Sequence, residues 1–94
     1  MTIMVTLEFT MQDNKQSGFL ELLGNALTDT RAYYGCIKVE TFAEADGSSV
    51  LLVEYWESRE HQETYFQWRI DTGLVDLIGP FISGPPVTKY YDIR

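Results

Sequence analysis

The segment CIKVETFAEADGSSVLLVEYW, residues 36–56, decides the fold of this chain. Its first part, residues 36–43, alternates β-branched side chains with polar ones, and its last part, residues 50–56, is almost entirely apolar or aromatic. Between them stands the run Asp46-Gly47-Ser48-Ser49, whose composition is typical of a tight turn. Two strand-forming runs joined by such a turn predict a β-hairpin.

The second strand of this hairpin is apolar on both of its faces. Successive side chains of a strand point to opposite sides, so odd and even positions form two separate faces. Apolar or aromatic residues occupy both sets, which are Val50, Leu52 and Trp56 on one face and Leu51, Val53 and Tyr55 on the other. A strand of this kind is typical of a sheet that is covered on both sides.

The residues before the hairpin predict one strand and one helix. Residues 3–9 alternate apolar and mostly polar side chains, as a half-buried strand does. A series at three- and four-residue intervals then predicts an amphipathic helix that contains Phe19, Leu22, Leu23, Ala26, Leu27 and Thr30. We expect Asp13 or Asn14 to cap this helix, and we expect it to end just before Gly35.

The residues after the hairpin predict a second helix and a last strand. Ser58 is a good N-cap for a helix over residues 59–70. Gly73 interrupts this helix, and the apolar residues 74–82 predict either a helical continuation or a short separate turn. A Pro-Pro pair then breaks any helix, and residues 87–93 supply the last strand.

These elements form one domain, residues 1–94, with the order β-α-β-β-α-β. This order is the α+β, ferredoxin-like arrangement, a four-stranded antiparallel sheet with both helices on one face. The helices leave the second face of the sheet bare, although its side chains are apolar. We therefore expect a homodimer in which two sheets pack face to face.

Composition excludes several classes of function. Fourteen acidic and seven basic residues give a net charge of −7, which repels phosphate backbones and anionic lipids, so we expect no nucleic-acid or membrane partner. The single cysteine, Cys36, cannot form an internal disulfide, and together with the single histidine, His61, it does not make a zinc site. We expect a reduced, cytoplasmic protein without a metal.

Several short motifs resemble the antibiotic biosynthesis monooxygenase family of dimeric α+β barrels. They are Thr30-Arg31 followed by Gly35-Cys36, the run Val53-Glu54-Tyr55-Trp56-Glu57-Ser58, and Gly84-Pro85-Pro86 before the last strand. The resemblance implies a homodimer with a pocket between sheet and helices. In the oxygenase branch it implies oxidation of small phenols or quinols by O₂ without a cofactor. The family also contains haem-degrading enzymes and an isomerase, so the fold alone does not determine the reaction.

The resemblance carries over only partly at single residues. Trp56 matches a pocket tryptophan of the polyketide oxygenases, but Leu52 stands where these enzymes have an asparagine. Their tyrosine on the second helix falls on Gln62, and Tyr65 lies one turn further on. The haem-degrading branch needs an asparagine on the first strand, a tryptophan on the second helix and a histidine about ten residues beyond that tryptophan. Here the first strand has no asparagine and no histidine follows His61, so we do not expect haem degradation.

Two residues are candidates for the base that deprotonates a phenol. His61 is the only side chain whose ordinary pKa lies near neutrality. Glu54 is the alternative, because burial would raise the pKa of its carboxyl group. A solvated histidine at the helix start and a merely structural glutamate are the competing interpretations.

Four residues are candidates for binding the aromatic substrate, namely Trp56, Tyr65, Trp68 and Leu52. The three aromatic residues are equally compatible with a place in the core. Arg69 could hold an oxyanion or a carboxylate, but we expect it to pair at the surface with Asp71 or Glu63.

The resemblance therefore implies a monooxygenase that oxidises a small phenol or quinol with O₂ and needs no cofactor. Two alternatives stay open: a non-catalytic dimeric module that binds a small molecule, and an isomerase-like member of the same family.

Overall fold

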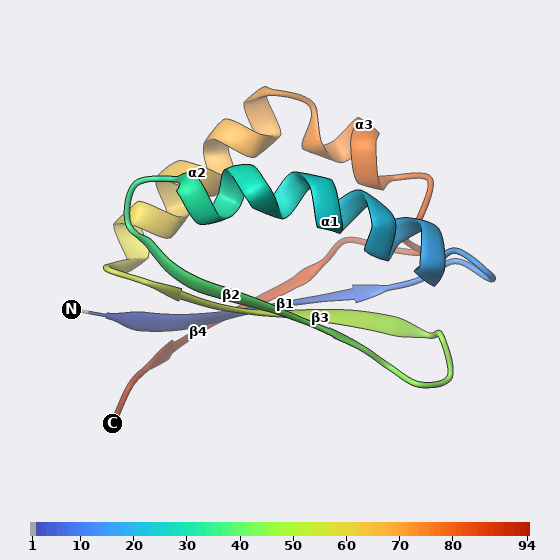
Figure 1. Cartoon of the computed structure of the whole chain (residues 1–94), viewed down its shortest axis with the longest axis horizontal. Helices are drawn as coiled ribbons and strands as arrows, with labels where there is room; N and C mark the ends of the chain where they lie inside the picture. Colours follow the sequence, from blue (N-terminus) through green and yellow to red (C-terminus); the bar gives the residue numbers. More distant parts are fainter. Residues whose placement is uncertain (1) are drawn as a thin grey trace.

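Four strands form one antiparallel sheet, and the helices pack on one of its faces (Figure 1). The computed structural model describes residues 2–94. In chain order the elements are β1 (Ile3–Thr10), α1 (Gln16–Ala32), β2 (Cys36–Ala43), β3 (Ser49–Trp56), α2 (Arg59–Asp71), α3 (Leu74–Ile78) and β4 (Val87–Asp92). The sheet order is β2-β3-β1-β4. The ferredoxin-like architecture expected from the sequence is confirmed, with α3 as an addition.

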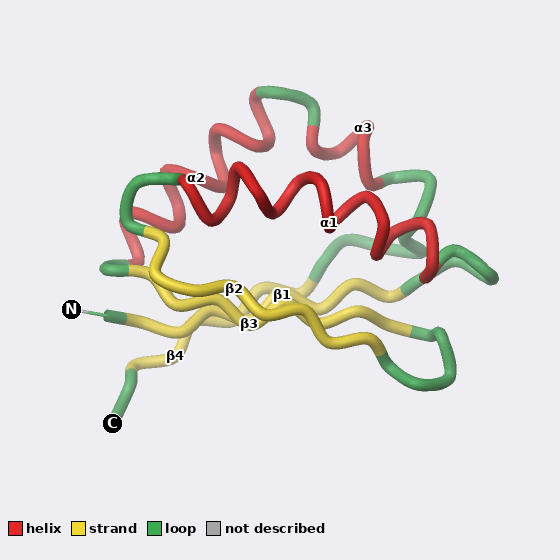
Figure 2. The backbone as a smooth tube through the Cα atoms, in the orientation of Figure 1, coloured by secondary structure: helices red, strands yellow, loops and turns green. Residues whose placement is uncertain are grey.

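The register of the sheet sets which side chains face the helices. In the central pair β1 and β3, Ile3 lies opposite Trp56 and Val5 opposite Glu54. The pairing of β2 with β3 shifts at a bulge between Cys36 and Lys38. Figure 2 shows the resulting two layers, with α1, α2 and α3 above the strands.

The start of α1 differs from the expectation. Its N-cap is Lys15, which makes no side-chain capping bond, so the prediction of Asp13 or Asn14 as the cap is wrong. Asn14 has a positive φ of 62°, and the backbone N–H of Lys15 donates to Gln12 O at 3.1 Å. The two residues therefore belong to a tight turn that precedes the helix.

The boundaries of the later elements agree with the pattern. Ser58 is the N-cap of α2, and its Oγ accepts from the backbone N–H of His61 at 3.2 Å. After Gly73, which has a φ of 101°, α3 is a short separate helix that ends before Pro80. Among the described helices, none has the length and hydropathy that a membrane crossing requires.

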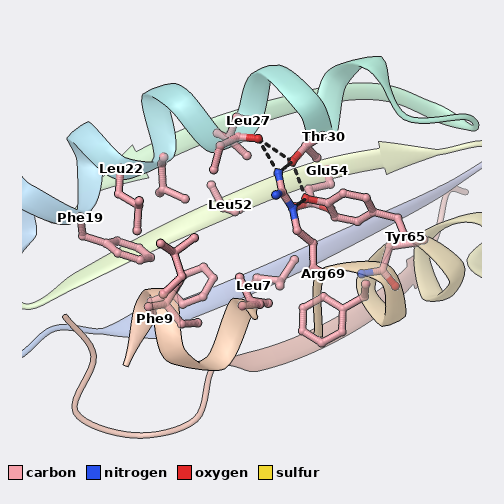
Figure 3. Close-up of a pocket in the computed structure, with 17 residues that line it drawn as sticks. Leu7, Phe9, Phe19, Leu22, Leu27, Thr30, Leu52, Glu54, Tyr65 and Arg69 are labelled. Carbon is pink, nitrogen blue, oxygen red and sulfur yellow. Dashed lines mark hydrogen bonds between the residues drawn. The ribbon is translucent and has the colours of Figure 1, made fainter. Parts of the chain in front are cut away.

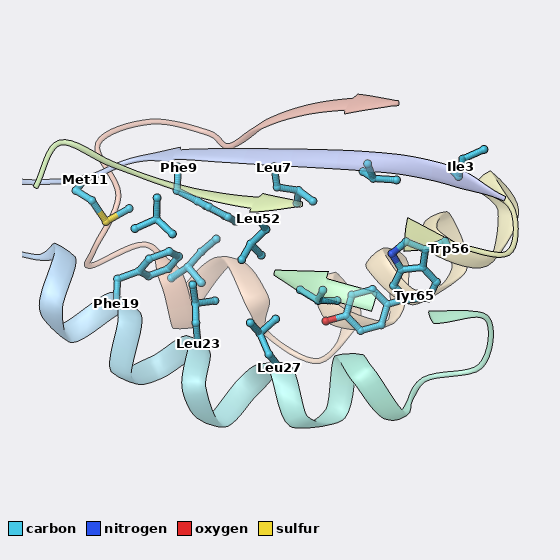
Figure 4. Packing of buried hydrophobic residues seen from close by; sticks show 14 residues of the cluster. Ile3, Leu7, Phe9, Met11, Phe19, Leu23, Leu27, Leu52, Trp56 and Tyr65 are labelled. Carbon is cyan, nitrogen blue, oxygen red and sulfur yellow. The ribbon is translucent and has the colours of Figure 1, made fainter. Parts of the chain in front are cut away.

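The core lies between α1 and the inner face of β1 and β3 (Figure 4). Phe19 is fully buried, and its ring centroid lies 5.1 Å from that of Phe9. Leu23 and Leu27 continue the same face of α1 toward Tyr65 of α2. At that end Trp56 is fully buried, with its ring centroid 5.2 Å from that of Tyr65.

The opposite face of the sheet carries apolar side chains that the described part of the chain does not cover. Leu51, Val53 and Tyr55 of β3 are only half-buried. Phe42 and Tyr91, on the two edge strands, are 49% and 43% exposed. No helix crosses this face in residues 2–94 (Figure 1). We call it the open face.

Candidate functional site

A cavity lies between the inner face of the sheet and the three helices (Figure 3). One part is apolar and is lined by Leu7, Phe9, Phe19, Leu23, Leu52 and Ile78. The other part is polar and is lined by Thr30, Glu54, Gln62, Tyr65 and Arg69. A ring with oxygen substituents fits this division, because its carbon atoms and its polar atoms find separate surroundings.

The free volume of the cavity is about 60 Å³. This suffices for a few waters, whereas a cavity that takes a benzene ring measures about 150 Å³. The outer wall includes Leu74 and Leu77 of the short helix α3, and Leu77 is 45% exposed. A ring-sized ligand therefore requires the walls to move apart. The short helix α3 is the part of the wall that can move most easily, because it is exposed.

Glu54 is the buried carboxyl group of the cavity. The alternation of β3 turns it toward the helices together with Leu52 and Trp56, and it is 3% exposed. The indole Nε1–H of Trp56 donates to Glu54 Oε1 at 2.9 Å. Burial raises the pKa of the Glu54 carboxyl, and the Trp56 hydrogen bond opposes this only in part. Oε2 has no hydrogen-bond partner among residues 2–94.

Tyr65, Thr30 and Arg69 form one hydrogen-bonded group at the polar end (Figure 3). Arg69 Nε donates to the Tyr65 hydroxyl at 2.7 Å, and Nη2 donates to the backbone oxygen of Ala26 at 2.6 Å. The hydroxyl groups of Tyr65 and Thr30 are also hydrogen-bonded to each other. Burial raises the pKa of Tyr65, while the bond from Arg69 lowers it in part. These hydrogen bonds hold α2 against α1.

Gln62 completes the polar lining. It is 1% exposed, and its Oε1 accepts from the Tyr90 hydroxyl at 2.7 Å. This bond joins α2 to the edge strand β4 and fixes the side chain of Gln62 against the cavity.

The structure brings together only some of the residues predicted from sequence. Glu54, Leu52 and Tyr65 line the cavity. Trp56 does not line it but supports both Glu54 and Tyr65 from behind. The Trp68 ring lies beside Tyr33, with a centroid separation of 5.4 Å, and the guanidinium carbon of Arg69 lies 4.9 Å from the Trp68 ring centroid. Both tryptophans are therefore one layer removed from the cavity.

His61 lies outside this cavity. It borders a separate surface hollow with Tyr33, Tyr34 and Glu60. Its Nδ1 is 2.6 Å from Ser58 Oγ, and its ring centroid is 5.1 Å from that of Tyr34. Gly35 has a φ of 91°, and a Cβ there would lie 2.5 Å from the His61 ring, so only glycine fits this contact.

Arg69 is the site residue whose surroundings the sequence pattern did not predict. The expected surface pair with Asp71 or Glu63 is wrong, because the guanidinium turns inward to Tyr65 and Ala26. Ala26 lies 43 residues earlier in the chain, and the sequence pattern gives no signal for the contact between α1 and α2. Thr30 belongs to the amphipathic pattern of the first helix and to the Thr30-Arg31 motif, and neither signal places it in the cavity.

Two further groups have a bearing on the chemistry. Burial, reinforced by the nearby Glu54, raises the pKa of the half-buried Cys36 thiol, which therefore has little thiolate character. Among residues 2–94, no cluster of three or more His, Cys, Asp or Glu side chains has the geometry to hold a metal ion.

Comparison with known families places this chain. The antibiotic biosynthesis monooxygenase family matches residues 2–68, which is most of the chain. The match covers β1, α1, β2, β3 and most of α2, and it contains the polar lining of the cavity except Arg69. The protein belongs to this family. The comparison with curated proteins found no match.

Solved structures of similar fold extend the comparison. A monooxygenase from Streptomyces coelicolor, in complex with the ligand nanaomycin D, has a TM-score of 0.81 and 21% identity over 98% of this chain and 87% of its own. A protein from Mycobacterium tuberculosis has a TM-score of 0.77 and 22% identity over 100% and 96%. A family member from Bordetella bronchiseptica has a TM-score of 0.84 and 18% identity over 99% and 97%. At these identities the likeness shows the fold.

Proposed function

We propose that this protein is a cofactor-independent monooxygenase that oxidises a small phenol or quinol with O₂. The observation that carries the proposal is a buried carboxyl group, Glu54, in the wall of an otherwise largely apolar cavity. Family membership supports the reaction class, and the S. coelicolor monooxygenase in complex with nanaomycin D supports the kind of ligand.

Glu54 acts as the base in this proposal. Its pKa is raised by burial, which brings it closer to the pKa of a phenol and makes proton transfer more favourable. The phenol O–H bond breaks, its proton binds to Glu54, and the resulting anion donates electrons to O₂. One oxygen atom enters the ring in place of hydrogen, and the other leaves as water. A quinol thus becomes a hydroxyquinone, with both reducing electrons supplied by the substrate.

The other wall residues orient the ring and exclude water. Leu52 and Tyr65 contact the ring from the sheet and from α2. Trp56 and Trp68 act from the second layer, because Trp56 holds Glu54 and Trp68 packs against Arg69. A dry cavity strengthens every electrostatic interaction inside it.

A second copy of this chain covers the open face in this proposal. The support is the apolar surface of β3 together with Phe42 and Tyr91, because large exposed apolar patches mark contact sites. The same patch on both copies is self-complementary across a two-fold axis. This surface is the support for a homodimer by sheet-to-sheet packing.

Oxygen consumption tests the proposed reaction. Purified, metal-stripped protein is mixed with hydroquinones, anthrones and catechols, and uptake is compared with the spontaneous rate. We expect turnover that Glu54→Gln lowers about 10²- to 10⁴-fold, the usual contribution of a general base. Glu57→Gln, an exposed neighbour, is the matched control. Uptake at the spontaneous rate, with thermal stabilisation by the same compounds, would instead indicate a non-catalytic binding module.

A further inference from the structure

Arg69 is a cation in the cavity wall that has no acidic partner among residues 2–94. The ion pairs found within residues 2–94 are Lys38 with Glu40, Arg59 with Glu63, and Arg94 with Asp92, all on exposed side chains. Arg69 takes part in none of them, although the chain carries a net charge of −7. The guanidinium instead binds neutral oxygen atoms of Ala26, Thr30 and Tyr65.

This arrangement holds the guanidinium in place and leaves part of it free. Nε and Nη2 are engaged by Tyr65 and by α1, whereas Nη1 has no hydrogen-bond partner among residues 2–94. The Trp68 ring, 4.9 Å away, packs against the guanidinium. Figure 3 shows the side chain reaching from α2 to α1 at the end of the apolar part of the cavity. A fixed, half-buried cation without a counter-ion favours an anion beside it.

The other charged and titratable groups near Arg69 do not fill this role. Glu54 and Tyr65 line the same cavity, and Asp76 of α3 borders an outer hollow that Arg69 also lines. Neither carboxylate lies within the 4 Å of an ion pair with Arg69, since no such pair is found in residues 2–94. The Tyr65 hydroxyl accepts from Arg69, so its own hydrogen is available for Thr30.

We propose that Arg69 binds the oxyanion that forms when the substrate phenol transfers its proton to Glu54. This inference rests on the proposed function and adds a second catalytic residue to it. When the proton moves from the phenol to Glu54, the carboxylate becomes neutral and the negative charge moves to the phenol oxygen. Arg69 then pairs with that oxygen, so the total charge of the cavity is unchanged. The cation thus stabilises the anion that reacts with O₂.

The ionisation of a bound phenol tests this role without any turnover. The probe is 4-nitrophenol, whose phenolate absorbs visible light, titrated with pH in the presence of saturating protein under nitrogen. We expect the bound phenol to have a pKa about one to three units below that of the free compound, as an opposite charge nearby produces. A bound pKa equal to or above the free value, or no binding of either form, would overturn the proposal.

Variants separate the charge from the fold. Arg69→Gln is expected to abolish the downward shift, and Arg69→Lys is expected to keep part of it, because the positive charge remains. Arg94→Gln removes one exposed positive charge at the end of the chain and is expected to leave the shift unchanged. If Arg69→Gln does not fold, wild type and Arg69→Lys still decide the question. A shift that survives in folded Arg69→Gln would contradict the assignment.

The two proposals fail in different ways. A lowered phenol pKa in wild type, together with the absence of oxygen uptake on any substrate, would keep Arg69 as an anion site and remove the oxygenase. Turnover with an unshifted bound phenol would keep the oxygenase and remove Arg69 from it.

Discussion

The two faces of β3 differ in what covers them. The inner set, Val50, Leu52, Glu54 and Trp56, is buried by the helices and contains a carboxyl group. The outer set, Leu51, Val53 and Tyr55, is entirely apolar or aromatic and remains half-exposed. A buried acid and an exposed apolar patch are the two departures from ordinary burial that indicate function. The inner face indicates chemistry, and the outer face indicates assembly.

The largest effect on stability is expected on the inner face. Phe19 is fully buried against Phe9, so Phe19→Ala should lower the free energy of unfolding by about 3–5 kcal/mol. Phe42, 49% exposed on the open face, is the matched control, and Phe42→Ala should cost far less. Urea unfolding at one low protein concentration measures both. Equal losses would show that the two faces contribute equally to the fold.

The next effect concerns the open face. Val53→Asp places a charge in the middle of β3 and should weaken a sheet-to-sheet dimer about 100-fold or more, as a disrupted interface centre does. Light scattering over a range of concentrations measures the change. Thr28→Asp, on the exposed surface of α1, adds the same charge and should leave the dimer intact. A monomeric wild type would leave the open face without its proposed cover.

The order and type of the elements could be predicted from the sequence because local signals specify them. The turn at Asp46–Ser49, the cap at Ser58 and the alternation in β3 each depend on neighbouring residues. The expected N-cap of α1 was wrong because Asn14 has a positive φ and belongs to a turn. Asparagine is common both in turns and at helix N-caps, so the residue type alone does not distinguish the two roles.

The polar end of the cavity could be predicted only in part. Strand alternation places Glu54 and Leu52 on one face, and the helical period places Tyr65. The partners of Arg69 depend on how α2 packs across α1, which no local pattern specifies. For the same reason His61 and Tyr65, one turn apart in α2, were expected at one site although they face different hollows.

A smaller effect is expected when the buried acid is neutralised. Below the ordinary glutamate pKa of about 4.3, the carboxyl is neutral in both the folded and the unfolded state. Burial raises the pKa of Glu54 in the folded state, so above about pH 4.3 the carboxyl group ionises in the unfolded chain while it is still neutral in the folded one. The free energy of unfolding therefore falls as the pH rises from the ordinary pKa to the raised pKa. Glu54→Gln should escape this loss.

The melting temperature of Glu54→Gln should therefore rise relative to wild type as the pH increases from about 4.3 toward the raised pKa of Glu54. Each unit of pKa difference corresponds to about 1.4 kcal/mol, and each kcal/mol to about 4–8 °C in a domain of this size. Glu57→Gln is the exposed control and should show no such trend. A melting difference independent of pH would contradict the raised pKa. The inner face would then hold an ordinary carboxylate.

The smallest effect is expected at His61, the other candidate base. His61→Ala removes the contact of Nδ1 with Ser58 Oγ and the packing on Tyr34, a loss of about 0.5–1.5 kcal/mol. The Ser58 cap itself persists, because it is made to the backbone N–H of residue 61. Since the imidazole borders a different hollow, oxygen uptake should remain near wild type. If His61→Ala instead lost as much activity as Glu54→Gln, the base would lie at the start of α2 and not on the inner face of β3.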